Sequence, residues 1–318
     1  MGLGHATRCI PVICTLKKAG HDVWLAGEGP QEQLLRQVFP ELPFLQLPGY
    51  RVKYGRSAAG TTWKLVKQLP AIKRAIKAEN RWLDRAHREH RFDMVISDNR
   101  FGLYHPGIRS VFITHQLWII HPWGKWASQI MQRWNYAQIK NFSECWVPDV
   151  KESPGLAGIL SHPAKMPAVP VKYIGPLSRL SAQPTATKPG HLFISISGPE
   201  PQRSILENEV MKQIAHYPGS ACIVRGLPNH DSFIPSTSSI RIYNHLNTAE
   251  YEKEMAMAET VVSRSGYTTV MDIMAMGKNA VLIPTPGQTE QEYLARHLQE
   301  TGQVKAVNSF ADFIKSIS

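Results

Sequence analysis

The sequence predicts an α/β protein made of two Rossmann-like domains that face each other across a cleft. Short β-branched runs alternate with helical segments along all 318 residues, which is typical of parallel sheets covered by helices. This length suits two domains of about 150 residues better than one core. A stretch rich in Pro, Thr, Ala and Lys at residues 181–190 is typical of a hinge. We therefore expect an N-terminal domain at 1–178 and a C-terminal domain at 190–318.

In the first domain, hydrophobic periodicity alternates between the values expected for helices and for strands. Gly20 ends the first predicted helix, and the polar, aromatic segment 49–60 is predicted to be a mobile loop. The strand at 145–148 is expected to be the last of this domain, with 171–175 crossing to the second. Helices are expected at 6–19, 31–38 and within 64–91, and strands at 22–26, 44–47, 94–97, 111–114 and 145–148.

The chain begins abruptly at a glycine-rich segment, Gly2–Gly4, which is followed by His5. A glycine-rich loop of this kind gains its geometry from the strand that it leaves. Only Met1 precedes the segment in this sequence. We therefore expect the first strand of the N-terminal sheet to be missing, and the chain to be shortened at its N-terminus.

The second domain contains the stretch around which the chain is organised. A β-branched run ends at Ser263, small polar residues follow, and helical spacing begins near Val270. The backbone N–H groups of Ser265, Gly266 and Tyr267 are expected at a helix N-terminus, where the helix dipole favours a phosphate. The other predicted elements are strands at 192–196, 221–224, 240–243 and 280–284, and a helix at 205–217.

Two groups of residues resemble a known family. The segment Arg264–Asp272, the strand that ends at Pro284 and the helix that opens with Gln291–Tyr293 resemble the donor site of GT-B glycosyltransferases of family 28. At the other end, Gly2–Arg8 resembles the acceptor-side loop and histidine of that family. Two such loops at opposite ends of an α/β chain, each matched to a different domain, are a specific signal.

The resemblance implies an inverting glycosyltransferase that moves a sugar, expected to be an N-acetylhexosamine, from a UDP-sugar to a lipid-linked acceptor. Asp272 would accept the ribose hydroxyls, and Gln291 would hold the sugar. Glu292 departs from a Gln-Gln pair in the family, so the identity of the sugar is open. The sequence does not identify the acceptor either. The residues expected to bind the donor are Ser197, Gly198, Arg225, His245, Leu246, Arg264, Ser265, Gly266, Tyr267, Thr269, Asp272, Gln291 and Glu292.

Two residues compete for the role of catalytic base. His5 lies in the acceptor-side loop, and a histidine titrates at about pH 6.5 in solution, which suits proton abstraction near neutrality. Asp98 follows a buried strand, at the edge where ligands of parallel sheets collect. Each could instead have a purely structural role. No paired carboxylates suggest a metal site, so backbone N–H groups, with Arg225 or Arg264, are expected to stabilise the leaving diphosphate without a metal or another cofactor.

The positive charge is concentrated in the first domain and suggests an anionic surface as partner. Residues 1–177 contain 24 Lys/Arg and 12 Asp/Glu, whereas residues 178–318 contain 12 Lys/Arg and 13 Asp/Glu. The segment 64–91 alone has nine basic and three acidic residues on a helical pattern, which would also fit a solvated helix face. Residues 117–126 place three tryptophans beside a lysine, as interfacial anchors do. We expect docking on anionic membranes.

Two other classes of function remain open. A sugar-nucleotide epimerase has the same two-domain fold and needs no acceptor. A non-catalytic nucleic-acid or lipid-binding protein would also be basic, but the aromatic residues lie in loops of one domain, so no nucleic acid is expected. No apolar run reaches the roughly 18 residues of a membrane span, so a cytoplasmic protein, peripheral on the membrane, is expected. Four separated cysteines, Cys9, Cys14, Cys145 and Cys222, suggest core thiols rather than disulfides or zinc ligands.

Overall fold

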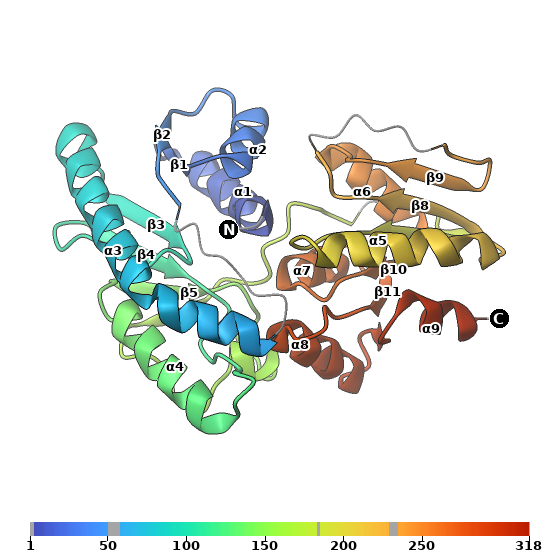
Figure 1. Ribbon diagram of the computed structural model, residues 1–318. Coiled ribbons are helices and arrows are strands. Elements are labelled where there is room, and N and C mark those ends of the chain that lie inside the picture. Colours follow the sequence, from blue (N-terminus) through green and yellow to red (C-terminus); the bar gives the residue numbers. More distant parts are fainter. Residues whose placement is uncertain (1–2, 50–57, 183–184, 229–234, 318) are drawn as a thin grey trace. The chain divides into compact units, whose positions relative to one another are not determined.

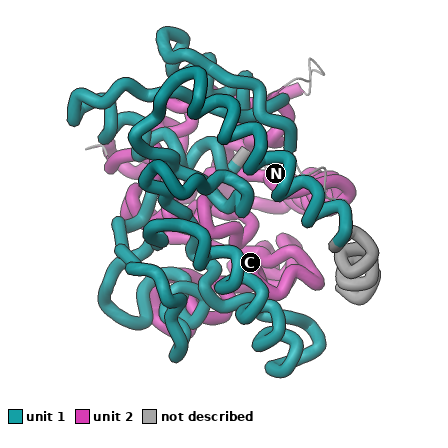
Figure 2. Tube along the Cα trace, turned by 90° about the vertical axis from the view of Figure 1, so that its left-hand side faces the viewer, with its two compact units in different colours: residues 1–177 teal, residues 178–318 magenta. Residues whose placement is uncertain are grey.

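A computed structural model describes residues 3–49, 58–182, 185–228 and 235–317 (Figure 1). The chain divides into two compact units, Met1–Leu177 and Ser178–Ser318 (Figure 2). The predicted hinge at 181–190 falls inside the second unit, and its last residues begin a strand. Of the predicted loop at 49–60, residues 50–57 lie outside the described residues, whereas 58–60 begin the helix Ala58–His90 and are not a loop. The side chains of residues 64–69, in the basic segment 64–91, also lie outside the described part of the chain.

Unit 1 contains two separate parallel sheets. The larger sheet has the order β3-β4-β5-β6, and β1 pairs with β2 in a smaller one. The segment predicted to cross between domains is instead β6, which pairs in parallel with β5 and continues the sheet. The strands are β1 (Leu25–Gly27), β2 (Phe44–Gln46), β3 (Met94–Asp98), β4 (Arg109–Ile113), β5 (Glu144–Val147) and β6 (Val171–Tyr173).

The helices of unit 1 cover these sheets. One apolar cluster joins α1 and α2 to the small sheet through Ile10, Leu25 and Leu35, and another packs α4 against the large sheet through Ile139 and Phe112. The described helices are α1 (Leu3–Lys18), α2 (Pro30–Val38), α3 (Ala58–His90) and α4 (Lys125–Ile139), with a 3-10 turn at Gly158–Leu160. The predicted loop around Gly4 and His5 is therefore the first turn of α1. None of the described helices is long and apolar enough to cross a membrane.

Unit 2 is a six-stranded parallel sheet with the order β12-β11-β10-β7-β8-β9. Its core packs the central strands against α5 and α9 through Ile194, Leu206, Val262 and Phe310. The strands are β7 (Lys188–Ser195), β8 (Ser220–Val224), β9 (Ile240–Tyr243), β10 (Ala258–Ser263), β11 (Asn279–Leu282) and β12 (Lys305–Ala306). The helices are α5 (Gln202–Gln213), α6 (Thr248–Met257), α7 (Tyr267–Ala275), α8 (Thr289–Glu300) and α9 (Phe310–Lys315), with a 3-10 turn at Ile214–His216.

The strand order of unit 2 reverses between β7 and β10. From β7 the chain builds outward through β8 and β9, and from β10 it builds the other way through β11 and β12. The loops that leave the two central strands therefore diverge, and ligands of open parallel sheets bind in the crevice at such a switch point, beyond the carboxyl ends of the strands. The residues that follow Ser195 and Ser263 are the ones this topology places there.

Candidate functional site

The donor-site residues predicted in unit 2 nearly all follow the carboxyl ends of neighbouring strands. Because the strands are parallel, these ends meet at one edge of the sheet. Residues that are far apart in the sequence are thereby collected at one edge. Ser197 and Gly198 follow β7, Arg225 follows β8, His245 and Leu246 follow β9, Arg264–Tyr267 follow β10, and Gln291 and Glu292 lie in the first turn of the helix after β11.

The loop from β10 to α7 is held to α8 by a side-chain hydrogen bond. Ser265 is fully buried, and its hydroxyl donates to the backbone carbonyl of Gln291 at 2.8 Å. Gly266 is the N-cap of α7, whose N-terminus has no side-chain cap hydrogen bond. Thr269 lies in the first turn of α7 and is half-buried, while the Tyr267 side chain packs into the core. The N-terminus of α7 therefore lies where the sequence predicted a phosphate site.

Gly266 is a glycine that the backbone itself does not require. Its φ of −69° and ψ of 135° are open to any residue. A Cβ built at Gly266 meets no atom within 4 Å, so the space in front of it is open. A glycine that is needed neither for φ nor for packing fits a position where a ligand approaches the backbone closely.

Gln291 and Glu292 brace the loop that precedes α8. The Gln291 Oε1 atom accepts from the Thr285 N–H at 2.9 Å, and the Glu292 Oε1 atom accepts from the Gly287 N–H at 2.8 Å. Gln291 also donates from Nε2 to Gln288 at 2.8 Å. The two side chains predicted to hold the sugar are thus already engaged in shaping this loop.

The two arginines considered for charge stabilisation are both engaged with the protein. Arg264 is 4% exposed, and its guanidinium donates to the carbonyls of Pro284 at 3.0 Å and Gln202 at 3.3 Å. Arg225 pairs with Glu207 and donates to the Asn244 side chain at 2.6 Å. Arg264 therefore fixes the backbone around the loop, while Arg225 is held at the end of β8 by an ion pair.

Gly226 sets the distance between the loops that follow β7 and β8. It has a φ of +70°, and a Cβ there would lie 2.5 Å from the carbonyl oxygen of Ile196. This close approach brings the backbone after β8 against Ser197. Beyond β9, His245 is exposed and Leu246 is buried, so the backbone there lies at the surface while the leucine side chain anchors it.

Asp272 lies in α7 and is almost fully buried. Its Oδ1 atom accepts from the Ser178 hydroxyl at 2.6 Å, whereas Oδ2 makes no hydrogen bond with any residue that the structure describes. Burial raises the pKa of Asp272 from 3.8 to about 6, against the lowering effects of the Ser178 hydrogen bond and the Arg179 charge. One oxygen of this carboxylate is thus available to a ligand that can donate.

Replacing Asp272 by Asn is expected to stabilise the ligand-free chain increasingly as the pH rises from about 4 to about 8. The folded state binds this proton more tightly than the unfolded state, so stability is lost as pH rises from 3.8 to about 6, by about 3 kcal/mol. The asparagine side chain would keep an acceptor for Ser178 without a buried charge. Urea unfolding of both chains across this range measures the difference; a difference that is constant with pH would contradict the assignment.

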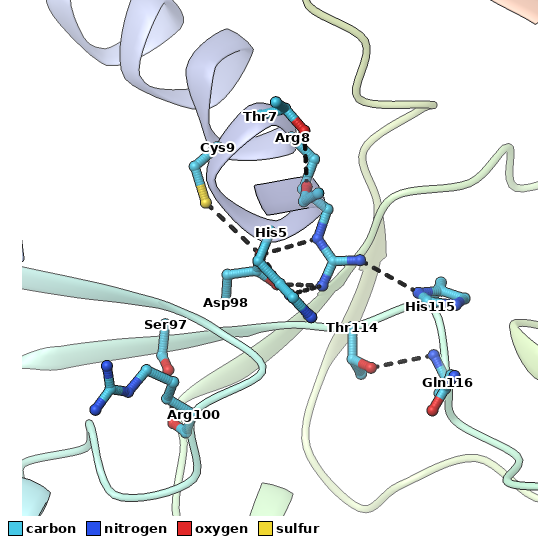
Figure 3. A network of polar contacts seen from close by, with 11 residues as sticks. His5, Thr7, Arg8, Cys9, Ser97, Asp98, Arg100, Thr114, His115 and Gln116 are labelled. Carbon is cyan, nitrogen blue, oxygen red and sulfur yellow. Dashed lines mark hydrogen bonds and ion pairs between the residues drawn. The ribbon is translucent and has the colours of Figure 1, made fainter. Parts of the chain in front are cut away.

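In unit 1 the structure brings both predicted bases together. The His5 Nδ1 atom lies 3.1 Å from the Asp98 Oδ2 atom, although the residues are 93 positions apart (Figure 3). Asp98 is the last residue of β3, and His5 is in the first turn of α1. Asp98 can only accept, whereas Arg8 Nη2, which lies 3.0 Å from the same Nδ1 atom, can only donate, so the two contacts favour opposite tautomers of His5. In the tautomer with the proton on Nδ1, that atom donates to Asp98 and Nε2 keeps its lone pair. His5 Nε2 makes no hydrogen bond with the residues described.

A buried arginine defines the charge of this cluster. Arg8 is 3% exposed and forms an ion pair with Asp98, and its Nε donates to Oδ2 at 2.9 Å. Burial alone would raise the pKa of Asp98, but the Arg8 charge and the His5 contact outweigh it and hold this pKa well below its usual range. Asp98 is therefore a permanent anion, too weakly basic to take a proton near neutrality.

From the sequence, Arg8 was named only as the end of the acceptor-side segment Gly2–Arg8, and no role was assigned to His115. Arg8 also lies 3.0 Å from His5 Nδ1 and 3.4 Å from His115 Nδ1. Since Arg8 is three residues after His5 on one helix, helical spacing could have placed both on the same face. Nearby, the Cys9 thiol donates to Asp98 at 3.7 Å, and its pKa is raised by burial and by the Asp98 charge.

Comparison with known proteins matches the second unit to a family. Residues 232–309 match the glycosyltransferase family 28 C-terminal domain. The UDP-N-acetylglucosamine--N-acetylmuramyl-(pentapeptide) pyrophosphoryl-undecaprenol N-acetylglucosamine transferase of Desulforudis audaxviator is 30% identical over 129 residues, 36% of this chain and 35% of that protein. The chain thus aligns with about a third of the length of this curated relative.

Solved structures resemble the chain over nearly its whole length. The alignment with the glycotransferase of kitacinnamycin covers 96% of this chain and 83% of that protein, with a TM-score of 0.63 and 15% sequence identity. The alignment with MurG of Acinetobacter baumannii covers 99% of this chain and 86% of MurG, with a TM-score of 0.57 and 15% sequence identity. The alignment with a Listeria monocytogenes protein assigned as UDP-N-acetylglucosamine 2-epimerase covers 99% of this chain and 84% of that protein. Its TM-score is 0.59 and the sequence identity is 12%.

These likenesses define the class of protein first: the chain has the GT-B fold of two Rossmann-like domains. Within that class the chain is similar to glycosyltransferase family 28, because residues 232–309 of unit 2 match the C-terminal domain of that family. The matched segment contains most of the predicted donor-site residues, from His245 to Glu292. The family resemblance predicted from the sequence is thereby confirmed.

Proposed function

We propose that the chain is an inverting glycosyltransferase that moves an N-acetylhexosamine from a UDP-sugar to a lipid-linked or membrane-held acceptor, without a metal. The observation that carries the proposal is the switch point between β7 and β10, where a Cβ built at Gly198 or at Gly266 meets no atom within 4 Å. Residues 232–309 of the same unit match the family 28 C-terminal domain. The diphosphate would bind at the N-terminus of α7, and the ribose hydroxyls would donate to Asp272.

His5 serves as the base in this proposal, and Asp98 orients it. Arg8 and Asp98 neutralise each other and are buried, so Asp98 remains an acceptor for Nδ1 throughout the reaction. In the tautomer that carries its proton on Nδ1, the lone pair of His5 Nε2 takes the proton of the acceptor hydroxyl as the glycosidic bond forms. The negative charge that develops on the leaving diphosphate is stabilised by the backbone N–H groups around Gly266 and the α7 dipole.

Donor binding provides the test of this function. Thermal unfolding of the full chain is followed with UDP, UDP-N-acetylglucosamine, UDP-glucose and the corresponding thymidine diphosphate sugars. A ligand at about a hundred times its dissociation constant stabilises the chain by about 2.7 kcal/mol. We expect stabilisation by UDP and the largest effect with a UDP-N-acetylhexosamine. Absence of stabilisation by every nucleotide, or stabilisation by nucleic acid instead, would contradict the proposal.

The acceptor is proposed to be membrane-held because of exposed tryptophans at the start of α4. Trp123 is 47% exposed and Trp126 is 59% exposed, and their rings stack with centroids 6.4 Å apart. Ile130, one helical turn after Trp126, is 54% exposed, and Lys125 lies beside both tryptophans in the sequence. Aromatic and aliphatic side chains beside a cation fit the lipid–water interface.

Replacing Trp123 and Trp126 by Ala is expected to abolish most binding to anionic vesicles. Burial of the two tryptophan side chains at the membrane interface would provide part of the attachment. Each basic residue near the anionic surface would add about 1 kcal/mol. Co-sedimentation with phosphatidylserine vesicles measures the effect, and high salt should weaken it. Trp24→Ala is the matched control, because Trp24 is 40% exposed but lies elsewhere, next to His90. Equal recovery with neutral vesicles, or an equal loss in the control, would favour a soluble acceptor.

A further inference from the structure

The first residues after unit 1, Ser178–Ser181, are held on a helix of unit 2, and we call them the connecting segment. Arg179 donates from Nη1 to the hydroxyl of Thr248, at the start of α6, at 3.1 Å. The backbone N–H and the hydroxyl of Ser181 both donate to the Glu252 Oε1 atom, further along α6, at 2.8 Å and 3.0 Å. These hydrogen bonds fix the connecting segment on α6.

The Ser178 hydroxyl connects this segment to α7 in a defined direction. Its oxygen accepts from the Leu180 N–H at 3.0 Å, and its proton is donated to the Asp272 Oδ1 atom at 2.6 Å. A hydroxyl has one proton, and an ionised carboxylate can only accept, so the donor and the acceptor of this contact cannot exchange roles. Since the connecting segment is itself fixed on α6, the position of Oδ1 is fixed as well.

The two oxygens of Asp272 therefore differ. Oδ1 is engaged by Ser178, whereas Oδ2 makes no hydrogen bond with any of the residues described. Asp272 is 8% exposed, and polar side-chain atoms at such positions normally have partners within the protein. An oxygen that lacks one, at a position proposed to meet the ribose, fits an acceptor that is left for the ligand.

The same hydrogen bond also acts on the charge of Asp272. Burial raises the pKa of this carboxyl to about 6, while the Ser178 hydrogen bond and the Arg179 charge lower it. The other titratable group that faces Asp272 is Tyr251 of α6, which stays neutral because burial raises its pKa to about 12. His245 faces Arg179 instead, and burial together with that charge lowers its pKa. Without Ser178 the carboxyl would keep its proton to a higher pH, and the protonated form is a weaker acceptor for hydroxyls.

We propose that Ser178 is a positioning residue of the donor site, which holds Oδ1 of Asp272 so that Oδ2 accepts from the ribose. The inference rests on the proposed function, because it places the ribose at Asp272. A brace that served stability alone would change the melting temperature but not the pH dependence of donor binding. The pH dependence therefore distinguishes the two roles.

Isothermal titration of UDP-N-acetylglucosamine into the full chain between pH 5 and pH 8 tests this role. A diphosphate diester, unlike free UDP, has no proton that titrates in this range. The affinity of the parent should fall as the pH drops through about 6, because Asp272 then becomes protonated. Ser178→Ala should bind about threefold more weakly than the parent at pH 8, where both carboxylates are charged and only orientation is lost. At pH 6 the loss should grow to about fifteenfold, since the fall in affinity begins about one pH unit higher in the variant.

Two further variants show whether the effect belongs to the hydroxyl of Ser178. Ser178→Thr keeps a hydroxyl and should restore the pH dependence of the parent. Ser181→Ala is the matched control, because it removes a hydroxyl of the same segment that donates to Glu252 instead of Asp272. A loss in Ser178→Ala that is the same at pH 6 and pH 8, or an equal change in Ser181→Ala, would overturn the proposal.

NMR titration of the Asp272 carboxyl carbon in the ligand-free chain separates this inference from the proposed function. Ser178→Ala should raise the pKa of Asp272 above the parent value of about 6, and Ser181→Ala should not. An unchanged pKa in Ser178→Ala overturns the inference, whatever the chain binds. If the pKa rises but the parent binds no nucleotide sugar, the proposed function fails, while the hold of Ser178 on Asp272 stands.

Discussion

Replacing Gly266 by Val should weaken binding of a UDP-sugar by about a hundredfold while the fold is kept. The backbone at Gly266 suits any residue, and a new side chain meets no atom within 4 Å, so the ligand-free chain accommodates it. The valine would fill the space proposed for the diphosphate. Losing two hydrogen bonds to charged phosphate oxygens, at about 1.5 kcal/mol each, corresponds to this factor.

Isothermal titration of UDP into Gly266→Ala, Gly266→Ser and Gly266→Val measures the effect as a series of increasing size. Affinity should fall in that order, while the melting temperature of the ligand-free chain stays within a few degrees of the parent. If the Gly266→Val variant binds UDP as tightly as the parent chain, the diphosphate lies elsewhere. If the melting temperature of all three ligand-free variants falls strongly, the space in front of Gly266 is not open.

His5→Gln should lower the turnover number by about 10²–10⁴-fold, the range of a lost general base, and leave donor affinity unchanged. His5 is 28% exposed at its side chain and donates one hydrogen bond to Asp98, so its replacement costs little stability. His216→Gln, at an exposed histidine of unit 2, is the matched control and should behave as the parent.

The double variant Arg8→Met/Asp98→Asn separates the role of Asp98 from its ion pair. Removing Asp98 alone would leave the buried Arg8 charge unpaired, which is destabilising. The double variant removes both charges and keeps His5. Turnover should fall, with an altered pH profile, because Nδ1 no longer donates to a carboxylate. An unchanged pH profile would mean that Asp98 does not orient His5.

Several strands of unit 2 could be predicted from the sequence because an apolar run gives way to small polar residues or Gly at the carboxyl end of the strand. Val262 and Ser263 precede Gly266 in this way, and β9 lies at the predicted residues 240–243. By contrast, α6 was not predicted, although Asn247 and Glu250 form a capping box that marks its start. The short β12 and α9 carry too few periodic residues to be recognised.

Long-range partners were less predictable. His5 and Asp98 were both candidates for one role, and only the fold shows that they contact each other and that Arg8 makes Asp98 an anion. Arg264 was expected to face the donor, but a charge in the sequence does not reveal that backbone carbonyls of Pro284 and Gln202 surround it. Tertiary contacts decided both cases, and hydrophobic periodicity carries no information about them.

The most direct test of sugar transfer follows the donor by NMR in the presence and absence of a lipid-linked acceptor on anionic vesicles. The full chain is incubated with UDP-N-acetylglucosamine, and the sugar's anomeric and C2 signals are recorded with the release of UDP. We expect UDP release only with the acceptor, and a β-linked product from the α-linked donor. Inversion at C2, or UDP release that is independent of the acceptor, would contradict it and identify an epimerase or a hydrolase instead.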